Sequence, residues 1–138
     1  MPSRIDGETV DAYRGAQYRV DDGFVLTIDQ RSAALATWQA AHGVACSALV
    51  TACNPAGQLF EAQHNHLATQ ALAARIEGAS WTSCPATGLD PQGQWPAEPG
   101  FLIAGLDLES ARALGEAFNQ NAIVWSAADA IPRLILLR

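Results

Sequence analysis

The stretch that most constrains this chain is residues 45–55, where small and branched apolar residues run without a charge until an Asn54-Pro55 pair. Such a run is typical of a strand that is buried on both faces. The pair ends it, because the residue before a proline avoids the helical region and proline offers no N–H to a neighbouring strand. Ligands often bind at the carboxyl end of a buried strand. Asn54 is therefore the first candidate site residue.

Periodicity and turn residues predict the remaining elements. Asp21-Asp22-Gly23 separates two short apolar runs and predicts a hairpin over residues 17–28. Ser32 and Asp107 are expected to cap helices. The pattern further predicts an N-terminal helix up to about residue 17, a helix at 32–42, a helix at 58–77, a strand at 81–86, an irregular Gly- and Pro-rich loop at 87–100, a strand at 101–105, a helix at 107–118, and strands at 122–125 and 133–137.

The order of these elements predicts an α+β fold. Residues 45–126 read strand-helix-strand-strand-helix-strand, which is the split β-α-β order of ferredoxin-like folds. We expect a mixed sheet with this core, preceded by a β-hairpin and a helix and followed by one extra strand. Right-handed crossovers would place the two long helices on one face. The length suits a single domain over residues 1–138.

Charge and composition exclude several classes of function. The net charge is −6, and all eight basic residues are arginines scattered singly along the chain. This scatter argues against nucleic-acid binding, and the lack of lysine excludes a Schiff-base or phosphate-loop lysine. The first residues lack the apolar core of a signal peptide, and no apolar stretch reaches the ~20 residues of a membrane span. Together with three cysteines that cannot all pair, these features predict a cytoplasmic protein with no membrane partner.

Metal and nucleophile motifs are weak. His64 and His66 are two positions apart on a predicted helix and would point in different directions, whereas helical metal ligands are spaced by three or four. His64 is expected to pack on the apolar stripe of Phe60, Leu67 and Ile76. Cys53 could pair with either histidine, but a buried inert thiol is the simpler interpretation. We therefore predict no metal and no cofactor.

Uncharged amides and one carboxylate stand at the ends of the predicted elements. They are Asn54, Asn65, Glu98, Gln120 and Asn121. Amides in such places often only cap helices and satisfy the loop backbone. Glu98 is more informative, because the neighbouring Trp95 and poor solvation would raise the pKa of its carboxyl group towards the range of a general acid or base. The alternative is a solvated acid or a partner for an arginine.

Several of these segments resemble a known bacterial family, domain-of-unknown-function family 3293. The resemblance rests on the Thr51-Ala52-x-Asn54-Pro55 strand end, on Asn65, and on the blocks that begin at Tyr18, Trp95 and Phe118. It implies that the five polar residues and Trp95 occupy family motif positions, but it implies no activity. The chain departs from the family pattern at Cys53, where an aromatic residue is common, and at Asn119, where a glycine is common.

Three functions remain open. The first is a binding module whose polar cleft takes a small ligand or a peptide end, with the ligand-binding residues Asn54, Asn65, Trp95, Glu98, Gln120 and Asn121. The second is a hydrolase or transferase in which Glu98 is the general acid or base. The third is a protein-interaction domain that uses Trp81, Trp95 and Trp125. The unknown partner is thus a small molecule or a protein.

The predicted topology brings the candidate residues to one end of the sheet. If the strands beginning at residues 101 and 122 run opposite to the strand at 45–53, Glu98 and Asn121 lie beside Asn54. This convergence depends on the strand order and is the geometric basis of the first two hypotheses.

Overall fold

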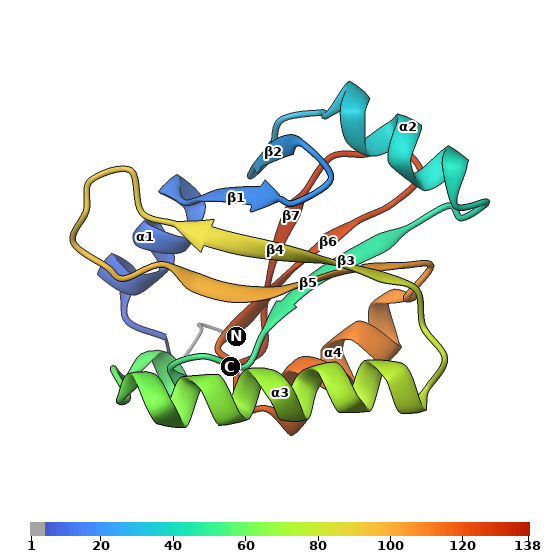
Figure 1. The fold of residues 1–138 in the computed structure, drawn as a ribbon. Coiled ribbons are helices and arrows are strands. Elements are labelled where there is room, and N and C mark those ends of the chain that lie inside the picture. Colours follow the sequence, from blue (N-terminus) through green and yellow to red (C-terminus); the bar gives the residue numbers. More distant parts are fainter. Residues whose placement is uncertain (1–4) are drawn as a thin grey trace.

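A computed structural model describes residues 5–138 and has four α-helices and seven strands in this range (Figure 1). No helix among these residues is long and apolar enough to cross a membrane. In chain order the elements are α1 (Gly7–Gly15), β1 (Gln17–Val20), β2 (Phe24–Thr27), α2 (Ala33–Ala41), β3 (Ser47–Thr51), the 3-10 turn η1 (Pro55–Gly57), α3 (Ala62–Gly78), β4 (Ser83–Leu89), β5 (Glu98–Ala104), α4 (Leu108–Ala117), β6 (Ala122–Ser126) and β7 (Arg133–Leu136).

Local sequence signals set many of these boundaries as expected. β1 and β2 form the predicted hairpin around Gly23, whose φ is +107°. The Ser32 hydroxyl accepts a hydrogen bond from the Leu35 N–H at 3.0 Å, and the Asp107 carboxylate accepts one from the Ser110 N–H at 3.1 Å. Both helices therefore begin at the predicted caps.

The seven strands form one curled sheet in the order β2-β1-β4-β5-β3-β6-β7. Every neighbouring pair is antiparallel, so the fold is α+β as predicted but the expectation of a mixed sheet is wrong. The N-terminal hairpin joins the sheet through β1, which pairs with β4, and β7 extends the other edge beside β6. β3 lies between β5 and β6, well inside the sheet.

Two hydrophobic cores lie on opposite faces of this sheet. One contains Leu35 and Trp38 of α2, and the other contains Leu72 of α3 and Leu114 of α4. Figure 1 shows α3 and α4 below the sheet and α2 above it. Because side chains alternate along a strand, β3 contributes Leu49 to the first core and its neighbours to the second. α1 lies at one end of the strands, beside the start of β1 and the tip of β4, and has no buried residue.

The β4–β5 hairpin is longer than its composition suggested. Residues 87–89 and 98–100 belong to strands, so the predicted loop at 87–100 is wrong at both ends. Gly100 is needed here, because a Cβ at this position would lie 2.4 Å from the Val50 carbonyl oxygen of β3. The glycine marks a close approach of two strands and not a turn.

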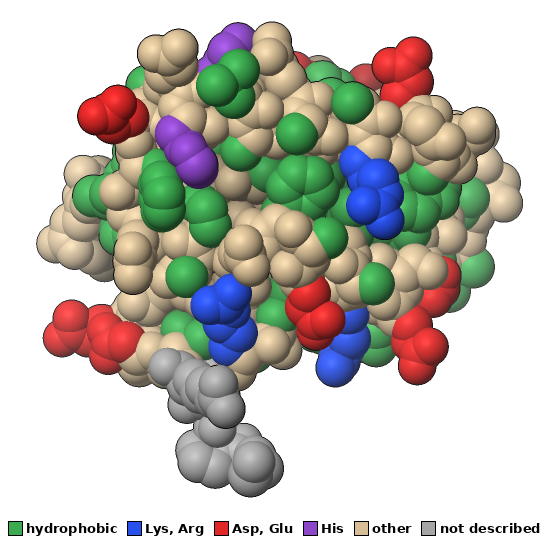
Figure 2. Space-filling view, turned by 90° about the horizontal axis from the view of Figure 1, so that it is seen from below, with side chains coloured by type: hydrophobic (Ala, Val, Ile, Leu, Met, Phe, Trp, Pro, Cys, Tyr) green, Lys and Arg blue, Asp and Glu red, His purple; other side chains and the backbone are tan. Residues whose placement is uncertain are grey.

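The buried face of α3 also differs from the expected one. The helix begins at Ala62, four residues late, because Pro55 starts a 3-10 turn and an extended segment follows it. Leu72 and Ile76 are buried, whereas Phe60 and Leu67 are exposed and His64 stacks on the Phe60 ring on the surface. Figure 2, which shows the molecule from the α3 and α4 side, has hydrophobic and histidine side chains exposed on this face.

Candidate functional site

Asn54 is the centre of a buried hydrogen-bond network just beyond the end of β3. Its backbone adopts the left-handed conformation, with φ +48°, which asparagine tolerates better than most residues. The side-chain Nδ2 donates to Glu98 Oε2 at 2.9 Å, and Oδ1 accepts from the Phe60 N–H and from Asn65 Nδ2, both at 2.9 Å. The Asn65 Oδ1 accepts from the Asn54 N–H at 2.9 Å. The side-chain amides of Asn54 and Asn65 are therefore both used within the protein, where they hold the chain around residues 54–60 and bind Glu98.

Glu98 is the first residue of β5, and its two carboxylate oxygens lie in different surroundings. Oε2 accepts hydrogen bonds from Asn54 Nδ2 at 2.9 Å and from the Trp95 indole Nε1 at 2.6 Å. Oε1 has no hydrogen-bond partner among residues 5–138. Every fully buried side-chain nitrogen or oxygen in this range does have one. Oε1 is therefore open to the cavities that Glu98 lines.

The environment of Glu98 raises the pKa of its carboxyl group. Burial raises the pKa above that of an ordinary glutamate, and the hydrogen bonds from Asn54 and Trp95 offset part of this rise. Since Oε2 accepts two N–H donors, the proton of the neutral form belongs on Oε1, which faces the cavity. The direction of the pKa shift and the effect of poor solvation are as expected, but Trp95 acts in the opposite sense, because its indole N–H stabilises the carboxylate and lowers the pKa.

Two tyrosines that were not among the predicted site residues stand close to Glu98. The Tyr18 hydroxyl of β1 donates to the Tyr13 carbonyl oxygen at 3.3 Å. The Tyr13 hydroxyl of α1 accepts from Asn121 Nδ2 at 3.2 Å. Burial and the nearby Glu98 charge raise the pKa of Tyr18, and burial raises that of Tyr13, so both remain neutral phenols at neutral pH. Their positions depend on the pairing of β1 with β4, which no local pattern indicated.

Gln120 and Asn121 lie at the amino end of β6, at the same end of the sheet as Asn54. Gln120 Nε2 donates to the Cys53 carbonyl oxygen at 3.1 Å and to the Phe118 carbonyl oxygen at 3.3 Å. Its Oε1 accepts no hydrogen bond from the described residues, and Gln120 lines a small cavity of about 60 Å³ with Glu98 and the two tyrosines. All six candidate residues therefore converge, but Asn65 lines none of the cavities described below.

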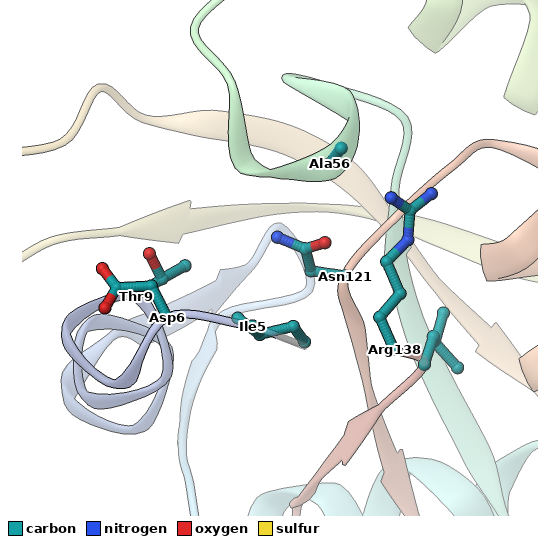
Figure 3. A pocket seen from close by; sticks show the side chains of 7 residues that line it. Ile5, Asp6, Thr9, Ala56, Asn121 and Arg138 are labelled. Atoms are coloured by element: carbon teal, nitrogen blue, oxygen red, sulfur yellow. The ribbon is translucent and has the colours of Figure 1, made fainter. Parts of the chain in front are cut away.

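The largest opening next to Glu98, which we name the Glu98 cavity, has a volume of about 270 Å³. It lies between α1, β1 and the β4–β5 hairpin, and its lining includes Ala12, Tyr13, Tyr18, Asp90, Trp95 and Glu98. A second cavity of about 460 Å³ is lined by Asp6, which precedes α1, by Thr9 of α1, and by Ala56, Asn121 and Arg138. Figure 3 shows Asn121 between the α1 side chains and Arg138 in this second cavity. Asn121 thus reaches from that cavity to the Tyr13 hydroxyl.

Strained backbone lies beside the site. Ala56 and Asn119 both have positive φ, +56° and +55°, and the Ala56 N–H donates to the Asn119 carbonyl oxygen at 2.7 Å. An alanine in this conformation costs about 1–2 kcal/mol, and such strain is common at functional sites. Asn119 adopts the left-handed conformation that a glycine would also favour.

Cys53 does not take part in the cavities. Its thiol is buried, 3.6 Å from the Thr69 hydroxyl and 3.6 Å from the Pro99 carbonyl oxygen, and neither His64 nor His66 contacts it in the described part of the chain. Within residues 5–138 no three His, Cys, Asp or Glu side chains are grouped so as to hold a metal ion.

Comparison with known proteins identifies the family but no activity. Residues 50–123 match the family described as protein of unknown function (DUF3293). This range is more than half of the chain and holds all six candidate residues, while Tyr13 and Tyr18 lie before it. No curated protein and no solved structure matches. The extent of the match shows that this chain belongs to the DUF3293 family of proteins of unknown function.

Proposed function

We propose that this chain is a binding module and that the Glu98 cavity holds its ligand, a small molecule. The observation that carries the proposal is the orientation of Glu98, because Asn54 and Trp95 bind Oε2 and thereby turn Oε1 towards the cavity. A volume of about 270 Å³ suits a small molecule and not a folded partner. A carboxylate fixed in this way is a strong, directional hydrogen-bond acceptor.

The candidate residues have two different roles in this proposal. Glu98 and Trp95 line the Glu98 cavity and would touch the ligand, and Gln120 adds an acceptor in the adjoining small cavity. Asn54 and Asn65 are positioning residues, because their amide groups are used within the protein. Asn121 positions the Tyr13 hydroxyl. The fixed network supports a site whose geometry exists before the ligand arrives.

We also propose that β3, α3, β4, β5, α4 and β6 form a ferredoxin-like split β-α-β core. Support comes from the order β6-β3-β5-β4 in the middle of the sheet and from the position of α3 and α4 on one face. In this view the N-terminal hairpin and α1 are additions that supply one wall of the cavity.

A ligand screen with a matched pair of variants tests the proposed function. Ala12 is an exposed residue of α1 that lines the Glu98 cavity, whereas Ala34 is an exposed residue of α2, on the other side of the sheet from α3 and α4. Thermal shifts are measured with amines, carboxylic acids, amino acids, nucleotides and sugars. We expect at least one class to stabilise the protein, Ala12→Phe to remove this effect, and Ala34→Phe to retain it. Stabilisation that Ala12→Phe leaves intact would place binding elsewhere and overturn the proposal.

A second candidate function, an enzyme with Glu98 as general acid or base, is favoured by one specific observation. Burial raises the pKa of Glu98, and the oxygen that would carry the proton faces the cavity. A panel of hydrolase and transferase substrates tests this function, with Glu98→Gln as the control. Activity that survives Glu98→Gln would remove Glu98 from the chemistry.

The third function, a protein-interaction domain, gains nothing from the tryptophans. Trp81 and Trp125 are partly buried and pack against the core, and the Trp125 indole donates to the Leu106 carbonyl oxygen at 3.0 Å. Trp95 is partly buried and donates to Glu98. These contacts leave no cluster of exposed tryptophans among residues 5–138.

A further inference from the structure

The lining of the Glu98 cavity carries negative charge without a balancing positive one. Asp6, Glu8, Asp90 and Glu98 line it, and no arginine or histidine does so within residues 5–138. Asp6 and Glu8 are exposed on the α1 side, and Asp90 accepts the N–H groups of Gln94 and Trp95. Arg138 lines only the second cavity, which shares Asp6 and Thr9 with the Glu98 cavity. A lining of this kind attracts cations and repels carboxylates and phosphates.

Aromatic rings form much of the remaining wall. Tyr13, Tyr18 and Trp95 line the cavity together with small apolar side chains such as Ala12 and Ala16. The faces of such rings attract cations, and indole does so most strongly. Their apolar surface also suits a hydrocarbon or aromatic group on the ligand. The wall therefore favours a molecule with both a positive charge and an apolar body.

The free oxygen of Glu98 defines where the charge would sit. Oε1 has no partner, while Trp95 Nε1 donates to Oε2 of the same carboxylate at 2.6 Å. A cation on Oε1 would therefore lie in the aromatic part of the cavity. A primary ammonium group has three N–H donors and no acceptor. It can therefore bind a carboxylate oxygen and needs no hydrogen-bond donor from the protein.

We propose that the Glu98 cavity binds a small organic cation, a primary ammonium group on an apolar or aromatic body. This inference rests on the proposed function, since it names the ligand class of the same cavity. The ammonium group binds Glu98 Oε1, and the body packs against Tyr18 and Trp95. Neutral molecules of the same shape lose the charge-assisted hydrogen bond, and amino acids add a carboxylate that the acidic lining repels.

Three probes of one shape separate these possibilities. Binding of 2-phenylethylamine, 2-phenylethanol and phenylalanine is measured by calorimetry and by the change in tryptophan fluorescence. We expect the amine to bind at least tenfold more tightly than the alcohol and than the amino acid, because a hydrogen bond to a charged group is worth about 10- to 100-fold in affinity. Equal affinity for the amine and the alcohol, or tighter binding of phenylalanine, would overturn the inference.

Variants of the cavity test whether Glu98 is the cause of the preference for the amine over the alcohol. Glu98→Gln keeps an oxygen for Asn54 and Trp95 but replaces the free acceptor by an N–H donor. Glu98→Gln should lower the affinity for the amine at least tenfold and change the affinity for the alcohol by less than twofold. If Glu98→Gln fails to fold, the double variant Asp6→Asn with Glu8→Gln, which changes only exposed side chains, tests the same inference. It should weaken the amine two- to fivefold at low salt and less at high salt.

The binding measurements distinguish a failure of the cation inference from a failure of the proposed function. If sugars, nucleotides or acids bind in place of amines and Ala12→Phe blocks them, the cavity is a binding site and only the cation inference is wrong. If no probe responds to Ala12→Phe, the proposed function fails and the inference fails with it. An amine preference that survives Glu98→Gln unchanged contradicts the inference alone.

Discussion

Glu98 has a raised pKa, and this gives it a defined effect on stability. The folded protein holds the Glu98 proton at pH values at which the unfolded chain has already released it, because burial disfavours the charge. The free energy of unfolding therefore decreases as pH rises from the ordinary glutamate pKa of about 4.3 through the raised one. Ionisation of the buried Glu98 carboxyl group therefore lowers the free energy of unfolding.

The variant Glu98→Gln removes this loss of stability, because glutamine does not ionise. We expect it to be at least as stable as the unaltered protein at neutral pH, and we expect the difference to shrink as pH falls below the ordinary glutamate pKa. Urea unfolding of the two proteins between pH 3 and 8 measures the difference. A difference that does not change with pH would contradict the raised pKa.

Asn54 combines a backbone role with a side-chain role, and two substitutions separate them. Asn54→Ala loses the hydrogen bonds to Glu98, Phe60 and Asn65 and forces alanine into φ +48°, so it should destabilise the protein by about 2–3 kcal/mol. Asn54→Gly loses the same bonds without the backbone cost and should be about 1 kcal/mol less harmful. Chemical denaturation measures both. Equal effects would mean that the left-handed conformation contributes no cost.

At the scale of elements, the β4–β5 hairpin depends on glycines that fit against neighbouring groups. A Cβ at Gly100 would lie 2.4 Å from the Val50 carbonyl oxygen, whereas one at Gly88 would lie 3.4 Å from the Tyr18 ring. Gly100→Ala should therefore destabilise the protein by about 1–3 kcal/mol, and Gly88→Ala by less than about 1 kcal/mol. Thermal unfolding of the two variants compares them. A larger loss for Gly88→Ala would contradict the close approach of β3 and β5.

α1 differs from the other helices because none of its residues is buried. It is held by the contacts of Tyr13 with Tyr18 and Asn121 and by an exposed ion pair between Arg14 and Asp29 at 3.7 Å. Exposed ion pairs contribute little. We expect the backbone amides of α1 to exchange hydrogen faster than those of α2, and a ligand in the Glu98 cavity to slow them selectively. Mass spectrometry measures the exchange, and equal protection of both helices would contradict this expectation.

At the scale of the whole molecule, the sheet couples the two cores. β3 and β5 contribute residues to both, with Leu49 and Leu102 on the α2 side and Val50 and Ile103 on the other. Leu35→Ala and Leu72→Ala, one in each core, should each cost about 2–5 kcal/mol and lower the same cooperative transition. Calorimetry checks this, and two separate transitions in either variant would show that the cores unfold independently.

The parts of the fold that were predictable from the sequence are those set by neighbouring residues. Gly23, Ser32 and Asp107 fix a turn and two helix starts through their own backbone or side chain. The convergence of Asn54 and Glu98 was predicted from an antiparallel order of strands. In the structure Asn54 Nδ2 lies 2.9 Å from Glu98 Oε2.

The parts that were not predictable depend on contacts between distant segments. The pairing of β1 with β4 brings Tyr18 to Glu98, and nothing in the residues around Tyr18 indicates it. Phe60 and Leu67 lie at helical spacing, but the shift of the helix start to Ala62 and the packing of Leu72 and Ile76 leave both exposed. The strands at Gly88 and Gly100 were hidden because glycine and proline are also typical of loops.

The lack of buried residues in α1 has a consequence for which parts of this chain can change. Substitutions on that helix alter one side of the Glu98 cavity without disturbing either core. They should therefore change the free energy of unfolding little. The opposite side, built on Asn54 and Glu98, is tied to the sheet and tolerates little change. If the Glu98 cavity binds a ligand as proposed, substitutions in residues 5–16 would therefore change which molecules this chain accepts, while the anchoring acid stays in place.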